Sequence, residues 1–208
     1  MATLAGARLQ AWRQHGLALA GLALLALLFF WPVTFGLGYI PRAGGDLVSL
    51  LWPNYSYAAR ALWAGRLPLW NPALFSGAPF ALDNQVSFFY PVNLLTFLAW
   101  PGLPYPAMEW LAVFHVWLAG AGMYLLLIAL LEPPAAPWPA LLAAVAYMFS
   151  DVFVTHVGNL NLNAVAAWLP WAFAGLHLAL ARRSAGWAAG AGVAVGLAVL
   201  AGHAQMTY

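Results

Sequence analysis

The acidic side chains are the groups in this sequence best suited to proton transfer, and there are only five among 208 residues. Asp46 stands directly after Gly44 and Gly45, and glycines allow a substrate to approach the backbone closely. A carboxylate placed there can accept the proton of an incoming hydroxyl group as a general base. The alternative is that Asp46 only caps a helix that begins at Leu47. Both interpretations stay open at this stage.

Two short polar stretches further along the chain carry groups that can bind a metal ion or a substrate. Asp151 and His156 lie close enough in one turn to ligate a single cation such as Mg²⁺ or Mn²⁺, although a loop aspartate is more often simply solvated. His203, followed by Gln205, is either a substrate contact or an interfacial hydrogen-bonding group. A metal site at the first stretch and a substrate site at the second are therefore hypotheses.

Asp83, Arg60 and Arg66 belong to the same segment as Asp46. Asp83 either contacts a substrate or caps a short helix over residues 84–90. The two arginines can bind a phosphate, or they can extend toward lipid headgroups. His115 and His177 fall inside apolar stretches, where we expect hydrogen bonds to backbone carbonyl groups.

The elements that must position these groups are membrane helices. Hydrophobic residues make up 65% of the chain and charged residues 6%, whereas soluble domains carry about 25% charged residues. Seven arginines without a lysine are too few for nucleic-acid binding. The absence of cysteine excludes disulfides and thiolate metal sites. The sequence therefore predicts an integral membrane protein.

Five apolar stretches predict an all-α, polytopic bundle with five transmembrane helices. They cover residues 16–34, 107–131, 138–150, 163–181 and 187–201. The first is too long for the core of a signal peptide, and the third is marginal in length. Pro170 predicts a kink in the fourth. Gly190, Gly192 and Gly196 predict close helix packing of the fifth.

The arginines predict the orientation of these helices. Arg8 and Arg13 precede the first helix, Arg182 and Arg183 separate the fourth from the fifth, and such residues favour the cytoplasmic side. The N-terminus is then cytoplasmic, and the long loop 35–106 lies on the outer side. All acidic residues except Glu132 fall on that outer side, as do His156 and His203.

The loop 35–106 has a helical pattern followed by a proline-rich stretch. Leu47, Leu51, Tyr55, Ala58 and Leu62 lie on one helical face, which predicts an amphipathic helix in the plane of the headgroups. We expect Gly65 to end it. Residues 67–79 contain too many prolines for regular structure. A short helical segment that opens at Asp83 is expected to be interrupted at Pro91.

Five short strings occur in order along the chain and resemble the YfhO-type family of bacterial membrane proteins. They are Gly65–Pro72 (GRLPLWNP), Phe75–Pro79 (FSGAP), Phe89–Asn93 (FYPVN), Ala167–Trp171 (AWLPW) and Ala201–Gln205 (AGHAQ). That family is similar to the GT-C superfamily of glycosyltransferases, whose donors are sugars linked to polyprenyl phosphate. The resemblance covers most of the chain from Gly44 onward.

The resemblance implies a transfer of sugar at the outer face of the bacterial plasma membrane, to an acceptor of the cell envelope. It implies an essential carboxylate in the first outer loop, a place that Asp46 holds, and Asp151 holds the corresponding place in the second. Asn71 and Asp83, the arginines Arg60 and Arg66, and the pair His203 and Gln205 become candidate substrate contacts. No D-x-D pair accompanies them, which leaves a metal requirement open.

Aromatic residues of the loop can serve the same reaction by stacking on sugar rings, although most are expected to anchor it at the interface. They are Trp63, Trp70, Phe75, Phe88, Phe89 and Tyr90.

Two other functions stay open: a transporter or flippase of lipid-linked intermediates, and a non-catalytic membrane assembly protein. A transporter is expected to carry ionisable groups at mid-membrane depth, and the acidic residues are not placed there. Because enzymes of this superfamily have more than five transmembrane helices, we also expect these 208 residues to be the N-terminal part of a longer chain.

Overall fold

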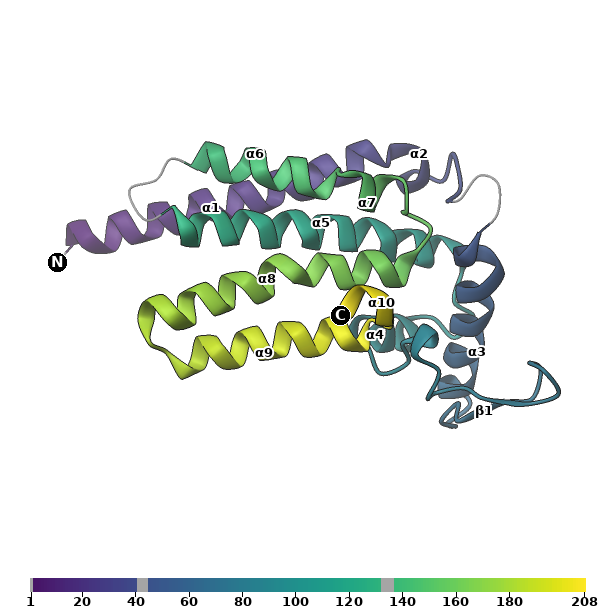
Figure 1. Cartoon of the computed structure of the whole chain (residues 1–208). Coiled ribbons are helices and arrows are strands. Elements are labelled where there is room, and N and C mark those ends of the chain that lie inside the picture. The colour runs from purple at the N-terminus through teal and green to yellow at the C-terminus, as the bar shows by residue number, and fades with distance from the viewer. Residues whose placement is uncertain (1, 41–44, 132–136) are drawn as a thin grey trace.

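A computed structural model describes residues 2–40, 45–131 and 137–208, with side chains from Trp12 onward. The chain is mostly helical, as the sequence predicts, and long helices lie side by side with a smaller folded segment at one end (Figure 1). Gly44 and Glu132, which are named in the predictions from the sequence, lie outside the described residues.

Five helices form the bundle: α1 (Ala2–Phe29), α5 (Tyr105–Leu130), α6 (Pro137–Met148), α8 (Leu160–Arg182) and α9 (Ala185–Leu200). Helix α5 lies at the centre and packs on α1, α6 and α8, while α9 packs on α8 (Figure 1). The short helices α2 (Trp31–Thr34) and α7 (Asp151–Val154) follow α1 and α6. The described ends of α1, α5, α6, α8 and α9 fall within a few residues of the predicted ranges, except that α1 begins earlier.

Three of the helices are long and apolar enough to cross a membrane: Trp12–Phe29 within α1, Tyr105–Leu130 and Leu160–Arg182. The 12 residues of α6 and the 16 of α9 are apolar but shorter. At about 1.5 Å per residue these two helices reach about 18 Å and 24 Å, against a hydrocarbon layer of about 30 Å.

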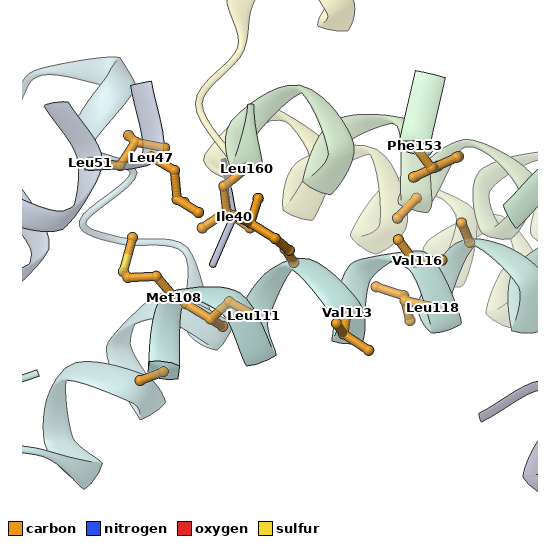
Figure 2. Packing of buried hydrophobic residues seen from close by; sticks show 14 of the residues in the cluster. Ile40, Leu47, Leu51, Met108, Leu111, Val113, Val116, Leu118, Phe153 and Leu160 are labelled. Carbon is orange, nitrogen blue, oxygen red and sulfur yellow. The ribbon is translucent and has the colours of Figure 1, made fainter. Parts of the chain in front are cut away.

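The core lies where α5 meets its neighbours. Met108, Leu111, Val113 and Val116 of α5 are buried, and apolar side chains from other parts of the chain, Ile40, Leu47, Leu51, Phe153 and Leu160, lie around the N-terminal half of the same helix (Figure 2). Small residues bring α5 close to its partners. A Cβ atom on Gly122 would lie 2.5 Å from the indole of Trp171, and one on Gly120 would lie 2.7 Å from the sulfur of Met148.

The segment 45–104 folds against one end of this bundle (Figure 1). It contains a single π-helical turn (η1, Leu47–Leu51), α3 (Trp52–Trp63), a two-strand hairpin of β1 (Trp70–Asn71) and β2 (Ala78–Pro79), a 3₁₀ turn (η2, Asn84–Val86) and α4 (Pro91–Ala99). The strands pair antiparallel, with Trp70 opposite Pro79.

The apolar face predicted for η1 and α3 is covered by the protein itself. Leu47, Leu51, Tyr55 and Ala58 were expected on one face of an amphipathic helix in the headgroup plane, and all four are buried inside the protein. Helix α3 packs on α4, and the Tyr55 ring lies edge-on to Phe97 of α4. Because the chain itself covers this face, the helix belongs to the protein core.

Prolines and glycines of this segment begin and end its elements. Gly65 ends α3 as predicted, with φ +69° and hydrogen bonds from Gly65 N to the Leu62 carbonyl and from Arg66 N to the Ala61 carbonyl. Residues 67–79 were expected to lack regular structure, yet they form the hairpin. Pro91 was expected to interrupt a helix and instead begins α4, because proline fits the first turn of a helix.

The glycines of α9 do not make the close contacts predicted for them within this chain. Cβ atoms added to Gly190, Gly192 or Gly196 would meet nothing within 4 Å. The close approach of α8 and α9 occurs at Gly175 instead, where a Cβ would lie 2.9 Å from the backbone nitrogen of Ala191. The residues that permit this packing therefore lie on α8.

Candidate functional site

A polar cleft of about 380 Å³ lies where the segment 45–104 meets the ends of α8 and α9. Its lining comes from four parts of the chain: the start of η1, the turn η2, the start of α8, and the residues that follow α9. The lining residues are Asp46, Leu50, Leu51, Asn84, Gln85, Asn159, Asn161, Leu162, Gly202, His203, Ala204 and Gln205.

The cleft brings together three residues that the sequence singled out, Asp46, His203 and Gln205. Four further amide side chains accompany them, from Asn84, Gln85, Asn159 and Asn161. Among the described residues that line the cleft there is one carboxylate, one imidazole and no lysine or arginine. An amide both donates and accepts hydrogen bonds, so this lining matches a neutral ligand rich in hydroxyl groups.

Asp46 is exposed, and its carboxylate accepts no capping hydrogen bond at the start of η1. Its backbone is itself helical, with φ −58° and ψ −31°, which is not the extended conformation of a side-chain cap. The carbonyl of Gly45 accepts the first hydrogen bonds instead, from the Ser49 hydroxyl at 2.8 Å and the Ser49 nitrogen at 3.0 Å. The capping alternative for Asp46 is therefore wrong, and Asp46 is a lining residue of the cleft.

Asn161 connects three walls of the cleft. Its Nδ2 donates to the carbonyl of Gln85 at 2.6 Å and to the carbonyl of Gly202 at 3.4 Å. Its Oδ1 accepts from the Tyr55 hydroxyl at 3.4 Å, and that hydroxyl accepts from Asn93 Nδ2 at 2.7 Å. Burial raises the pKa of Tyr55, so the phenol stays neutral in this network. The amide of Asn161 thus fixes η2 against both α8 and the end of α9.

The backbone at Gly202 approaches η2 so closely that no side chain fits. Gly202 has φ +84°, and a Cβ there would lie 2.1 Å from the Asn84 carbonyl oxygen and 2.1 Å from the Ser87 hydroxyl. The Ser87 hydroxyl donates to the Ala201 carbonyl at 2.7 Å. These contacts set the position of His203, whose Nδ1 is buried and has no hydrogen-bond partner among the described residues.

A second polar cluster supports the same region from inside the bundle. The Tyr90 hydroxyl accepts from Trp168 Nε1 at 2.9 Å and lies 3.0 Å from Nε2 of His115. Nδ1 of His115 lies 2.6 Å from the Leu111 carbonyl. His177 likewise contacts a backbone carbonyl, that of Ala129, at 3.2 Å. The expectation of carbonyl partners for both histidines is confirmed.

The structure places the remaining substrate-binding candidates outside the lining of the cleft. Arg60 and Arg66 are exposed on and after α3. Asn71 is buried in the hairpin, where its Oδ1 accepts from the Ala73 nitrogen at 3.0 Å. Asp83 accepts from the Gln85 nitrogen at 2.9 Å, which confirms the helix cap, although the helix is only the short turn η2.

Asp151 and His156 lie near α7, and the carboxylate of Asp151 accepts a hydrogen bond from the Thr155 hydroxyl. Across the described part of the chain, no three histidine or acidic side chains come close enough together to hold a metal ion.

The aromatic residues of the loop divide into two groups. Phe88 and Tyr90 are buried, so they contribute to packing and hydrogen bonding. Trp63, Trp70, Phe75 and Phe89 are exposed, Phe75 to 95%, and none of them lines the cleft. Interface anchoring is the role that this placement favours for the four exposed rings.

Four residues that supply amide groups to the cleft were not predicted from the sequence: Asn84, Gln85, Asn159 and Asn161. One signal was available, because Asn159, Asn161 and Asn163 alternate at the start of an otherwise apolar helix. Amides at such a position need hydrogen-bond partners, and Asn163 Nδ2 donates to the His156 carbonyl at 3.0 Å. Comparison with known proteins found no matching family model, no matching curated protein and no matching solved structure.

Proposed function

We propose that this protein is a membrane glycosyltransferase of the bacterial plasma membrane. It transfers a sugar from a polyprenyl-phosphate donor to a cell-envelope acceptor at the outer face. One observation carries the proposal: Asp46, near the start of the chain, and His203 and Gln205, near its end, line one cleft with four amide side chains. The five strings that resemble the YfhO-type family support it.

The cleft has the groups that the sugar side of this reaction needs. Amide side chains bind the hydroxyl groups of a sugar, since each offers both donors and acceptors. The Asp46 carboxylate takes the proton of the acceptor hydroxyl while the oxygen of that hydroxyl bonds to the anomeric carbon. The bond from that carbon to the phosphate oxygen breaks, and the phosphate leaves with the electron pair.

The positive charge that neutralises the donor phosphate must come from groups that do not line the cleft. No arginine or lysine is among the described residues of the cleft, and Asp46 is the one carboxylate there. Mg²⁺ commonly takes one or two carboxylates together with the phosphates of a substrate, so a single carboxylate in the lining leaves a metal requirement open. The proposal includes no step that depends on a resident metal ion.

The arrangement of helix ends supports the membrane orientation in this proposal. Helix α7, which begins at Asp151, and the segment with α3 and α4 lie at one end of the bundle, whereas the N-terminus and the turn between α8 and α9 lie at the other (Figure 1). We propose that all five helices of the bundle cross the membrane, including the shorter α6 and α9, with the N-terminus and Arg182 on the cytoplasmic side. An impermeant thiol reagent on intact cells should then label Ser76→Cys and not Ser184→Cys; labelling of Ser184→Cys contradicts this orientation.

The function itself is tested in proteoliposomes that contain a radiolabelled polyprenyl-phosphate hexose and a crude envelope acceptor. A transferase consumes the lipid donor and moves label into the acceptor fraction. A flippase changes the side on which the donor is accessible without consuming it, and an assembly protein does neither. Donor translocation without consumption, or neither change, would refute the proposal in favour of the corresponding alternative.

A further inference from the structure

A second cavity, of about 820 Å³, lies between α5, α8 and α9, away from the polar cleft. Its walls are mainly apolar. Leu125 and Ile128 come from α5, Trp171 and Leu178 from α8, and Val193 and Ala194 from α9. All three helices are apolar, and α5 and α8 are long enough to cross a membrane. An occupant of this groove is therefore apolar along most of its length.

The groove exists because α8 and α9 approach closely at one point and leave open space beside it. At Gly175 a Cβ would lie 2.9 Å from the Ala191 nitrogen, so the backbones are in contact there. Gly190, the neighbour of Ala191, lines the groove, and its Cβ would meet nothing within 4 Å. Glycine at position 190 thus leaves a volume that a larger side chain would fill.

One end of the groove is cationic. Arg182 ends α8 and lines the groove together with Trp187, and its guanidinium carbon lies 5.7 Å from the centre of the Trp187 ring. A cation at this distance from an indole face is attracted to it. Arginine and tryptophan at the end of a transmembrane helix are typical of the headgroup level of a bilayer. The groove therefore combines an apolar body with a positive mouth at headgroup depth.

We propose that this groove binds an anionic phospholipid, with an acyl chain along the apolar walls and the phosphate at Arg182. The charge at the mouth decides the occupant. Basic pockets between transmembrane helices bind anionic headgroups, and a guanidinium matches phosphate oxygens in geometry and charge. A zwitterionic lipid has the same acyl chains but no net charge, so its headgroup gains less binding free energy at Arg182.

The location is tested with a matched pair of variants. Gly190→Leu fills the groove, whereas Gly192→Leu makes the same change two residues away on α9, where the Cβ also meets nothing within 4 Å and does not line the groove. Purified, delipidated protein is titrated with dioleoyl phosphatidylglycerol, and bound lipid is counted by native mass spectrometry. We expect Gly190→Leu to lose one bound lipid and Gly192→Leu to bind as wild type does. Equal binding by both variants overturns the location.

The charge selectivity is tested with Arg182→Gln and with Arg66→Gln, which removes an arginine that does not line the groove. One arginine at a membrane surface favours an anionic lipid by about fivefold. Wild type and Arg66→Gln should therefore prefer phosphatidylglycerol over dioleoyl phosphatidylcholine by about this factor, and Arg182→Gln should lose the preference. Equal binding of the two lipids by wild type, or an unchanged preference in Arg182→Gln, overturns the proposal.

Discussion

The Ser87 hydroxyl donates a 2.7 Å hydrogen bond to the carbonyl oxygen of Ala201, which joins the segment 45–104 to the end of α9. This contact sits beside Gly202 and fixes the backbone from which His203 enters the cleft. Asn161 donates to the carbonyls of Gln85 and Gly202, which belong to the same two segments. The cleft therefore depends on a small set of buried or half-buried hydrogen bonds. Each of these contacts can be tested by a single substitution.

Gly202→Ala should destabilise the protein. The added Cβ would lie 2.1 Å from both the Asn84 carbonyl and the Ser87 hydroxyl, and the backbone has φ +84°. Overpacking of this kind costs about 1–3 kcal/mol. Denaturant unfolding in detergent measures the loss. Gly196→Ala, where a Cβ meets nothing within 4 Å, is the control and should match or slightly exceed wild type. Equal stability of Gly202→Ala and wild type would show that η2 and Gly202 are not in contact.

Asn161→Ala should open the cleft. The substitution leaves the half-buried carbonyl of Gln85 and the buried carbonyl of Gly202 without their amide donor, at a cost of about 1–3 kcal/mol. Limited proteolysis should then cut faster near residues 84–87. Asn159→Ala lies in the same cleft and should change stability by about 0.5 kcal/mol or less. If the two variants behave alike, Asn161 is not the residue that holds the walls together.

Alkaline pH should weaken the fold through Tyr90. Burial raises the pKa of the Tyr90 hydroxyl from 10.0 to about 12. Between these values the unfolded chain releases the proton while the folded chain keeps it, so stability falls as the pH rises. One pKa unit equals about 1.4 kcal/mol, which is the loss expected from Tyr90 at pH 11. The pH slope of Tyr90→Phe should be shallower than that of wild type or of Tyr39→Phe, which alters an exposed ring. Identical slopes for all three proteins would contradict this assignment.

Gly175→Ala should disturb the pairing of α8 with α9. Its Cβ would lie 2.9 Å from the Ala191 nitrogen, and the nearest atoms are mainly backbone, so relief requires a shift of a whole helix. We expect a loss of about 1–3 kcal/mol in unfolding free energy, as for other overpacked contacts. Gly192→Ala, on the open side of α9, should be tolerated. If Gly175→Ala has the same unfolding free energy as wild type, the close contact between α8 and α9 lies elsewhere.

The helices could be predicted from the sequence because apolar length and terminal prolines and glycines act locally. Gly65 illustrates this, since its positive φ and the hydrogen bonds around it depend only on residues of the same turn. The open space beside Gly190 could not be predicted, because glycine spacing permits close packing but does not determine which helix packs there. The close contact occurs at Gly175 because the backbone of α9 at Ala191 packs against it.

The candidate site was predictable only in part. Asp46 and His203 were recognisable as isolated polar groups in an apolar chain, and the structure puts both in one cleft. The amides of Asn84 and Asn161 were not recognised, because their role depends on contacts between segments far apart in the sequence. Arg66 and Asn71 share a string with family-like residues but lie in the exposed turn and the hairpin.

The central claim is that the Asp46 carboxylate accepts a proton in sugar transfer, and Asp46→Asn tests it most directly. Asparagine keeps the size and polarity of the side chain but removes the base. Asp83→Asn is the matched control, because Asp83 lies outside the lining of the cleft and asparagine caps a helix about as well as aspartate. The measurement is the initial rate of transfer from a polyprenyl-phosphate sugar in membranes that contain equal amounts of each protein. We expect a rate about 10²–10⁴ lower for Asp46→Asn and a near wild-type rate for Asp83→Asn. Near wild-type turnover by Asp46→Asn would contradict it.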